Sequence, residues 1–154
     1  MPNTKRDEVT DLIVTLLGTT PPGGVPVAKR GFLFDMSAAS VPAITVFPEN
    51  DDLELRGDGK GAPDITKHRV AIRVEVRAKS DTTHSADQNA ELMLNWIEKT
   101  LNGRIPTDRT GPFHIMHIDS IEWDYEQMEH GYVLVKNKLI VELQNKYNDP
   151  NAWT

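Results

Sequence analysis

The stretch HRVAIRVEVRAKS, residues 68–80, decides the fold of this chain. Apolar and polar side chains alternate along residues 68–79, which is the pattern of a β-strand with one buried face and one polar face. The polar face is unusual, because it carries four cations against one carboxylate: Arg69, Arg73, Arg77 and Lys79 against Glu75. The chain as a whole has a net charge of −6, so this row of cations is expected to meet an acidic surface.

Two amphipathic helices are predicted on either side of this strand in the sequence. The first covers residues 4–17, where apolar residues recur at helical spacing: Val9, Leu12, Ile13, Leu16 and Leu17. The second covers residues 85–102 and begins with a capping box formed by Ser85 and Gln88. Its apolar face is predicted to hold Ala86, Ala90, Met93, Ile97 and Leu101, widened by Leu92 and Trp96.

Three further strands are predicted, over residues 41–47, 114–125 and 131–146. Within 114–125 the isoleucines do not share one face of a regular strand, which predicts a bulge near His117–Asp119. The row of apolar residues in 131–146 is interrupted by Asn137.

Two polar segments complete the chain. Residues 48–67 are predicted to form a long flexible loop with a brief extended piece at 53–56, and residues 147–154 a polar C-terminal tail. The chain, 1–154, is then one α+β domain with a mostly antiparallel four-stranded, or slightly larger, sheet and two helices packed on one face.

Composition narrows the range of functions. The chain has no cysteine, so disulfides and thiolate metal sites are excluded. No segment has the length of apolar sequence that a membrane helix needs, and no signal peptide is evident, so no membrane partner is expected. The acidic balance disfavours a dedicated nucleic-acid-binding protein.

We expect no catalytic residues, no metal site and no cofactor. The acidic residues Asp51, Asp52, Glu54 and Asp58 do not follow the spacing of a calcium-binding loop. The pair His114 and His117 would point to opposite faces of a strand. Glu122, Asp124 and Glu126 could be paired catalytic carboxylates, but the polar face of a strand is the better explanation of them.

The order of these elements resembles the tail terminator proteins of long-tailed bacteriophages. The resemblance covers about residues 5–145 and lies in the pattern: an N-terminal helix, VPAITVF after a Pro/Gly loop, an acidic loop, HRVAIRVEVRAKS, a helix with Trp and Met, and IEWDYEQMEHGYVLVKNKLIVEL. No single motif is diagnostic. The chain differs from that pattern in its long C-terminal tail and its basic strand face.

The resemblance implies a structural protein of the virion, assembled in the host cytoplasm, and not an enzyme. Its partners would be other copies of itself in a ring, with a hexamer expected, the tail tube protein, and a head-completion or neck protein. DNA would pass through the lumen without specific binding. Two alternatives stay open: another neck or head–tail connector protein, and a small ligand-binding or hydrolytic domain.

For a ring, the residues expected at the subunit or tube interface are those of the basic row and of the acidic segment before it. They are Arg69, Arg73, Arg77, Asp51, Asp52, Glu54 and Arg56. The guanidinium fork of arginine pairs well with carboxylates, which favours contact between the basic row of one subunit and an acidic surface of the next. Solvated surface is the alternative interpretation.

Overall fold

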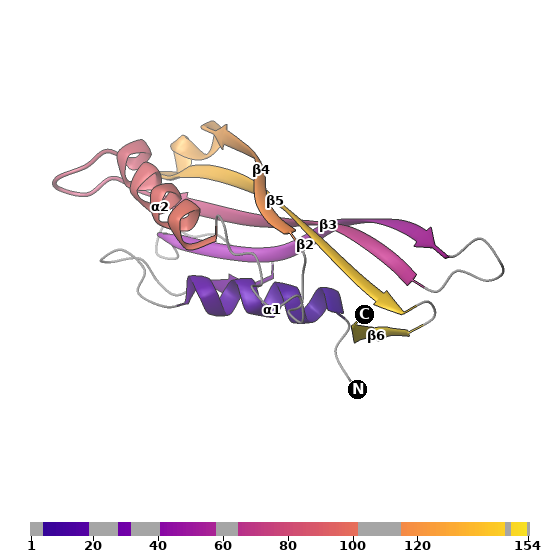
Figure 1. Ribbon diagram of the computed structural model, residues 1–154. Helices are drawn as coiled ribbons and strands as arrows, with labels where there is room; N and C mark the ends of the chain where they lie inside the picture. The colour runs from indigo at the N-terminus through magenta and orange to yellow at the C-terminus, as the bar shows by residue number, and fades with distance from the viewer. Residues whose placement is uncertain are drawn as a thin grey trace.

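The computed structural model describes residues 5–18, 28–31, 41–57, 65–101, 115–146 and 149–153. Two helices and one sheet make up these residues (Figure 1), which confirms the predicted α+β class. The elements follow in the order α1 (Lys5–Leu17), β1 (Lys29–Arg30), β2 (Ala43–Arg56), β3 (Ile65–Ala78), α2 (Ala86–Leu101), β4 (Ile115–Asp124), the 3-10 helix η2 (Glu126–His130), β5 (Val133–Lys146) and β6 (Asp149–Trp153).

The sheet has six strands in the described part of the chain, where four or slightly more were predicted. Its order is β1-β2-β3-β5-β4, and β6 pairs with the end of β5. The sheet is mixed: β1 runs parallel to β2, while the other pairings are antiparallel. The prediction missed β1 and β6, because two-residue and proline-containing strands carry no alternating signal.

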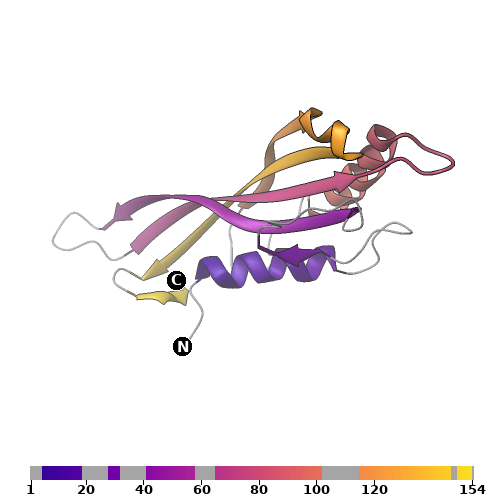
Figure 2. The same cartoon turned by 180° about the vertical axis from the view of Figure 1, so that it is seen from behind.

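Both helices pack on the same face of the sheet, as predicted. The apolar side of β3 is fully buried there, from Val70 to Ala78, together with the alternate residues of β5. Helix α1 contributes Val9, Ile13 and Leu17 to the same core. Figures 1 and 2 show α1 running along the sheet and α2 near one end of it. The alternation in residues 68–80 therefore identified the buried face correctly.

The predicted boundaries of the loop at 48–67 are wrong. Strand β2 continues through Arg56 and β3 begins at Ile65, so residues 48–56 and 65–67 belong to strands, and residues 58–64 lie outside the described part of the chain. The acidic residues of 49–54 have low strand propensity, but Asp51, Asp52 and Glu54 are each paired in register with the long, strongly apolar β3, and Glu49 lies at a bulge. The predicted tail at 147–154 likewise contains β6, whose backbone pairs with β5 at Asn145 and Lys146.

Helix α2 buries the predicted residues from Ala86 to Leu101, and Leu94 in addition. Leu92 was assigned to the buried face, which is wrong: its side chain is 48% exposed. The backbone N–H of Ser85 donates to Gln88 Oε1 at 3.0 Å, which is one arm of the predicted capping box. The Ser85 hydroxyl donates instead to Asp87 Oδ1 at 2.5 Å.

The bulge predicted in the C-terminal strands is confirmed. The register of β4 against β5 shifts between Ile118 and Ser120, which makes Asp119 the bulged residue. Asn137 is fully buried in β5, where its Nδ2 donates to the carbonyl of Val74 at 3.1 Å.

Candidate interaction surface

The basic row of β3 lies on the face of the sheet opposite both helices, which we call the second face. The strand register places the acidic strands β2 and β4 on the two outer sides of the central pair β3 and β5. The central strands β3 and β5 carry the cations Lys67, Arg69, Arg73, Arg77, Lys136 and Lys138. The flanking strands β2 and β4 carry the carboxylates Glu49, Asp52, Glu54, Glu122 and Asp124. The charge on this face therefore changes from strand to strand: β2 is acidic, β3 and β5 are basic, and β4 is acidic. The exceptions are Glu75, Glu142 and Arg56.

Arg73 is paired within its own chain. Its guanidinium donates twice to the carboxylate of Glu49, through Nε at 3.2 Å and through Nη2. Glu49 is the residue at the β2 bulge, between Pro48 and Asn50, and the bulge brings its side chain onto the second face. The hydrogen bonds from Arg73 hold the pKa of the Glu49 carboxyl below its ordinary value, although partial burial acts in the opposite direction.

Arg77 is also paired, and it is buried rather than exposed. Its Nη2 donates to Glu75 Oε2 at 2.7 Å, and Nη1 to Thr45 Oγ1 at 3.3 Å. The side chains of Arg77 and Glu75 are only 10% and 12% exposed. Arg77 is therefore a structural residue within the second face, and it is not offered to another molecule as the sequence prediction expected.

The predicted acidic partners divide between the two faces of β2. Asp51 lies on the helix side, where its Oδ2 accepts from Arg6 Nη1 at 2.9 Å and lies 2.8 Å from His68 Nδ1. Its side chain is 12% exposed, so it joins the first turn of α1 to β2 and β3. Asp52 lies on the second face, in register with Arg69.

The end of the β2–β3 hairpin extends past the first turn of α1 (Figure 1). There Arg56 donates from Nε to Glu54 Oε1 at 3.1 Å, between two well-exposed side chains. On the helix side of this end, Leu53 and Leu55 are 61% and 55% exposed. The sequence around these leucines only weakly indicated a strand, because ENDDLEL alternates polar and apolar residues only at its end.

On the second face, two cations remain without an ion pair to any described residue: Arg69 and Lys138. Arg69 lies in register between Asp52 and Glu142, but Glu142 is within 3.9 Å of Lys67. Lys138 lies opposite Arg73, a residue of like charge, and its charge also helps to lower the pKa of the Glu49 carboxyl. The acidic pair Glu122 and Asp124 is held by Lys136, at 3.9 and 3.8 Å, and this is a structural arrangement.

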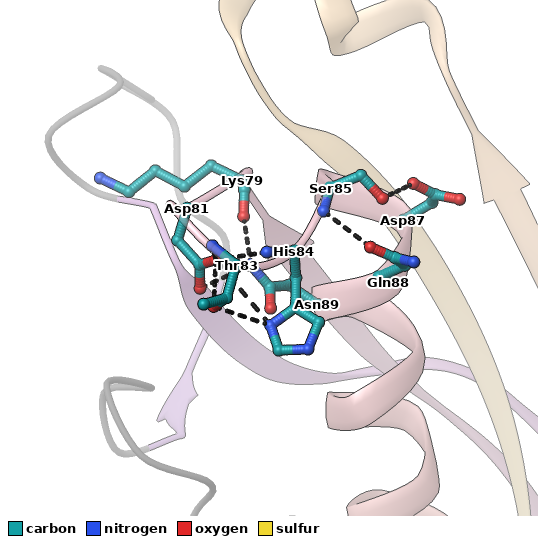
Figure 3. Close-up of polar contacts among 8 residues, drawn as sticks. All are labelled: Lys79, Asp81, Thr83, His84, Ser85, Asp87, Gln88 and Asn89. Carbon is teal, nitrogen blue, oxygen red and sulfur yellow. Dashed lines mark hydrogen bonds and ion pairs between the residues drawn. The ribbon is translucent and has the colours of Figure 1, made fainter.

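The connection between β3 and α2 holds a dense polar network, drawn in Figure 3. Asp81 Oδ1 accepts from the backbone N–H groups of Thr83 and His84, at 2.8 and 2.7 Å. Its other oxygen accepts from Asn89 Nδ2 at 3.2 Å. The two backbone N–H groups lower the pKa of Asp81 from 3.8 to about 2. The network fixes the backbone just before α2, and its polar groups are hydrogen-bonded to one another.

The described residues contain no group of three or more metal-ligating side chains placed to hold an ion. His114 and Asp58, which the sequence analysis considered as ligands, lie outside the described residues. No helix in the described part of the chain has the length and apolarity needed to span a membrane. Comparison of the chain with protein-family models and with curated proteins finds no match.

Proposed function

We propose that the protein is a structural subunit of a virus particle that acts as a tail terminator. Copies of it would form a ring on the end of the tail tube of a long-tailed bacteriophage, stop the growth of the tube, and offer the surface to which the head docks. The observation that carries the proposal is the second face: a broad, banded charged surface to which neither helix contributes.

A charged sheet face suits contact between subunits better than it suits a small ligand. Ligand sites are concave and mostly apolar, with a few polar groups directed inward. The hollow on the second face has a volume of about 300 Å³ and is lined mainly by charged residues: Glu49, Glu75, Arg73 and Lys136, with Phe47 and Pro48 at one side. Charge patterns of this kind fix the register and choice of protein partners.

The hairpin end supplies a second contact surface. Leu53 and Leu55 lie on the same side of β2, beyond Asp51, which accepts a hydrogen bond from Arg6 of α1. Two adjacent exposed leucines at the end of a protruding hairpin are typical of a surface buried in an assembly. In a ring on a tube, this end would contact the tube or a neighbouring subunit.

The ionisable groups support a structural role in preference to a catalytic one. Asp51 and His68 have the geometry of a carboxylate that orients an imidazole, which hydrolases use. The same carboxylate oxygen, however, also accepts from Arg6. That second bond stabilises the negative charge and ties the cluster to α1, so its role is to hold three elements together.

Two measurements test the proposal. The mass of the purified chain in solution is expected to be that of a ring, with a central hole visible by electron microscopy. Added to polymerising tube protein from the same genome, the chain is expected to bind one tube end and stop elongation. Binding to the portal end of heads, with no effect on tubes, would instead identify a neck protein, and a monomer that hydrolyses generic esters or phosphates would refute the proposal.

A further inference from the structure

The outer face of α2 is the strongest unpartnered surface outside the second face. It forms a hollow of about 410 Å³, lined by His84, Gln88, Glu91, Leu92, Asn95 and Glu98. Leu92 lies among these polar residues and is 48% exposed, although the other leucines of the helix are buried. An exposed leucine ringed by polar groups has the composition of the centre of a small protein contact.

The carboxylates of this face are available for a partner. Glu91 and Glu98 form no ion pair with any described residue, in contrast to Asp87, which accepts from the Ser85 hydroxyl. They are seven residues apart on the helix, which places them on one side and about 10 Å apart along its axis. Leu92 follows Glu91 directly, about 1.5 Å from it and about 9 Å from Glu98 along the helix axis, so the exposed leucine lies at one end of the acidic pair.

The second face carries a pattern of opposite charge. Its two cations without an ion pair, Arg69 and Lys138, lie on neighbouring strands. Since Lys138 is opposite Arg73, they are offset by four residues, or about 13 Å along the strands. Ala71 and Ile140 are paired in register between them, and both are buried, so the contact surface here is supplied by the charged side chains. Two glutamates beside a leucine can therefore meet two cations whose long side chains accommodate the small difference in spacing.

We propose that the outer face of α2 in one copy docks on the second face of the sheet in the next copy, with Glu91 and Glu98 meeting Arg69 and Lys138. This inference rests on the proposed function, because it assigns the contact that builds the ring. A chain of net charge −6 repels its own copies, and contact between groups of opposite charge offsets that repulsion.

The position of the two surfaces determines the kind of assembly. Helix α2 lies on one side of the sheet, and the second face is by definition the other side. A contact between different surfaces on opposite sides is head-to-tail, so each copy keeps one free surface of each kind until a ring closes. A two-fold dimer does not use such a contact, because it needs the same surface on both copies.

Charge reversal tests this contact. Three proteins are compared with the unaltered chain by light scattering: Glu91→Lys/Glu98→Lys, Arg69→Glu/Lys138→Glu, and the variant that combines all four changes. Each double variant is expected to weaken association at least tenfold, and the combined variant to recover most of it. Raising the salt concentration should weaken the unaltered assembly, because exposed ion pairs are screened.

The charge-matched control for Glu91→Lys/Glu98→Lys is Glu126→Lys/Glu129→Lys on η2, which makes the same change in net charge at exposed residues that belong neither to α2 nor to the strands of the second face. It should assemble like the unaltered chain. Circular dichroism and the unfolding midpoint show whether each variant is folded. If a charge reversal prevents folding, Glu91→Gln/Glu98→Gln and Arg69→Gln/Lys138→Gln replace it, with a smaller but measurable loss of association.

The outcomes separate this inference from the proposed function. Double variants that assemble within twofold of the unaltered chain, a combined variant that does not recover, or an unaltered chain that stays monomeric or stops at a dimer would each overturn the contact. Tube capping is measured separately with the unaltered protein. If the tubes are capped while the double variants still form rings, the terminator function stands and only this interface is wrong.

Discussion

Helix α2 offers two leucines that differ mainly in burial, and their replacement by alanine gives a sharp test of the packing. Leu101 is 1% exposed and lies in the core with Ile97, whereas Leu92 is 48% exposed on the outer face. Leu101→Ala removes a buried side chain and leaves a cavity, so it is expected to lower the free energy of unfolding by about 2–5 kcal/mol. Leu92→Ala loses only about half of the apolar burial of a leucine, and alanine has the higher helix propensity, so a change below about 1 kcal/mol is expected.

The assay is urea unfolding followed by circular dichroism, with the slope of the transition compared between the proteins. Because self-association would stabilise the folded state, each protein is measured at two concentrations and at high salt. Equal destabilisation by the two substitutions, or a loss below about 0.5 kcal/mol for Leu101→Ala, would show that the buried face of α2 has been assigned wrongly. Leu92→Ala should also weaken association between copies while the fold stays intact. Leu101→Ala should weaken association only to the extent that it unfolds the chain.

Three further predictions concern polar groups. The buried Oδ1 of Asn137 accepts no hydrogen bond from any described residue, whereas its Nδ2 donates to Val74; Asn137→Leu should raise the free energy of unfolding by about 1 kcal/mol, because the cost removed at Oδ1 exceeds the one bond lost, and a loss of stability in urea unfolding would contradict this. Arg77→Met leaves the largely buried Glu75 carboxylate without its ion-pair partner and should lower the free energy of unfolding by about 3–5 kcal/mol. The double variant Glu75→Gln/Arg77→Met should recover most of this loss, and a double variant as unstable as Arg77→Met would refute the pairing. Folding lowers the pKa of Asp81 from 3.8 to about 2, so its carboxylate stabilises the fold fully above about pH 4 and progressively less toward pH 2. Asp81→Asn should therefore lower the melting temperature at neutral pH. The difference in melting temperature between the two proteins should shrink between about pH 4 and pH 2.

The sequence predicted the elements whose own residues determine them. The alternation in β3 and β5 located the buried face, the misfit of three isoleucines located the bulge at Asp119, and helical spacing located both helices. Leu92 was misassigned because seven apolar residues on one helix define a face wider than the sheet can cover. The structure then buries Leu94 in its place, a choice that depends on how the helix is rotated over the strands.

The environment of the basic row could not be predicted in the same way. Arg73 and Glu49 are 24 residues apart in the sequence, and they meet only because β2 continues as a strand and carries a bulge at Glu49. Local propensity argued against that continuation, since the acidic residues after Pro48 do not favour strands. Long-range pairing with β3 outweighed it, and this pairing converted a predicted loop into the acidic flank of the second face.

The banded charge also bears on how copies can join. Apart from the short edge strands β1 and β6, the edges of the sheet in the described part of the chain are β2, beyond its pairing with β1, and β4, and each of these two carries carboxylates and a bulge, at Glu49 and at Asp119. Edge strands with charges and bulges resist pairing with another strand, and Pro48 removes a backbone donor from β2 as well. Two such acidic edges brought to the spacing of neighbouring strands, about 4.8 Å, would repel each other. Extension of the sheet from copy to copy is thus disfavoured at both edges, which leaves the faces, and the opposite charges they carry, to direct assembly.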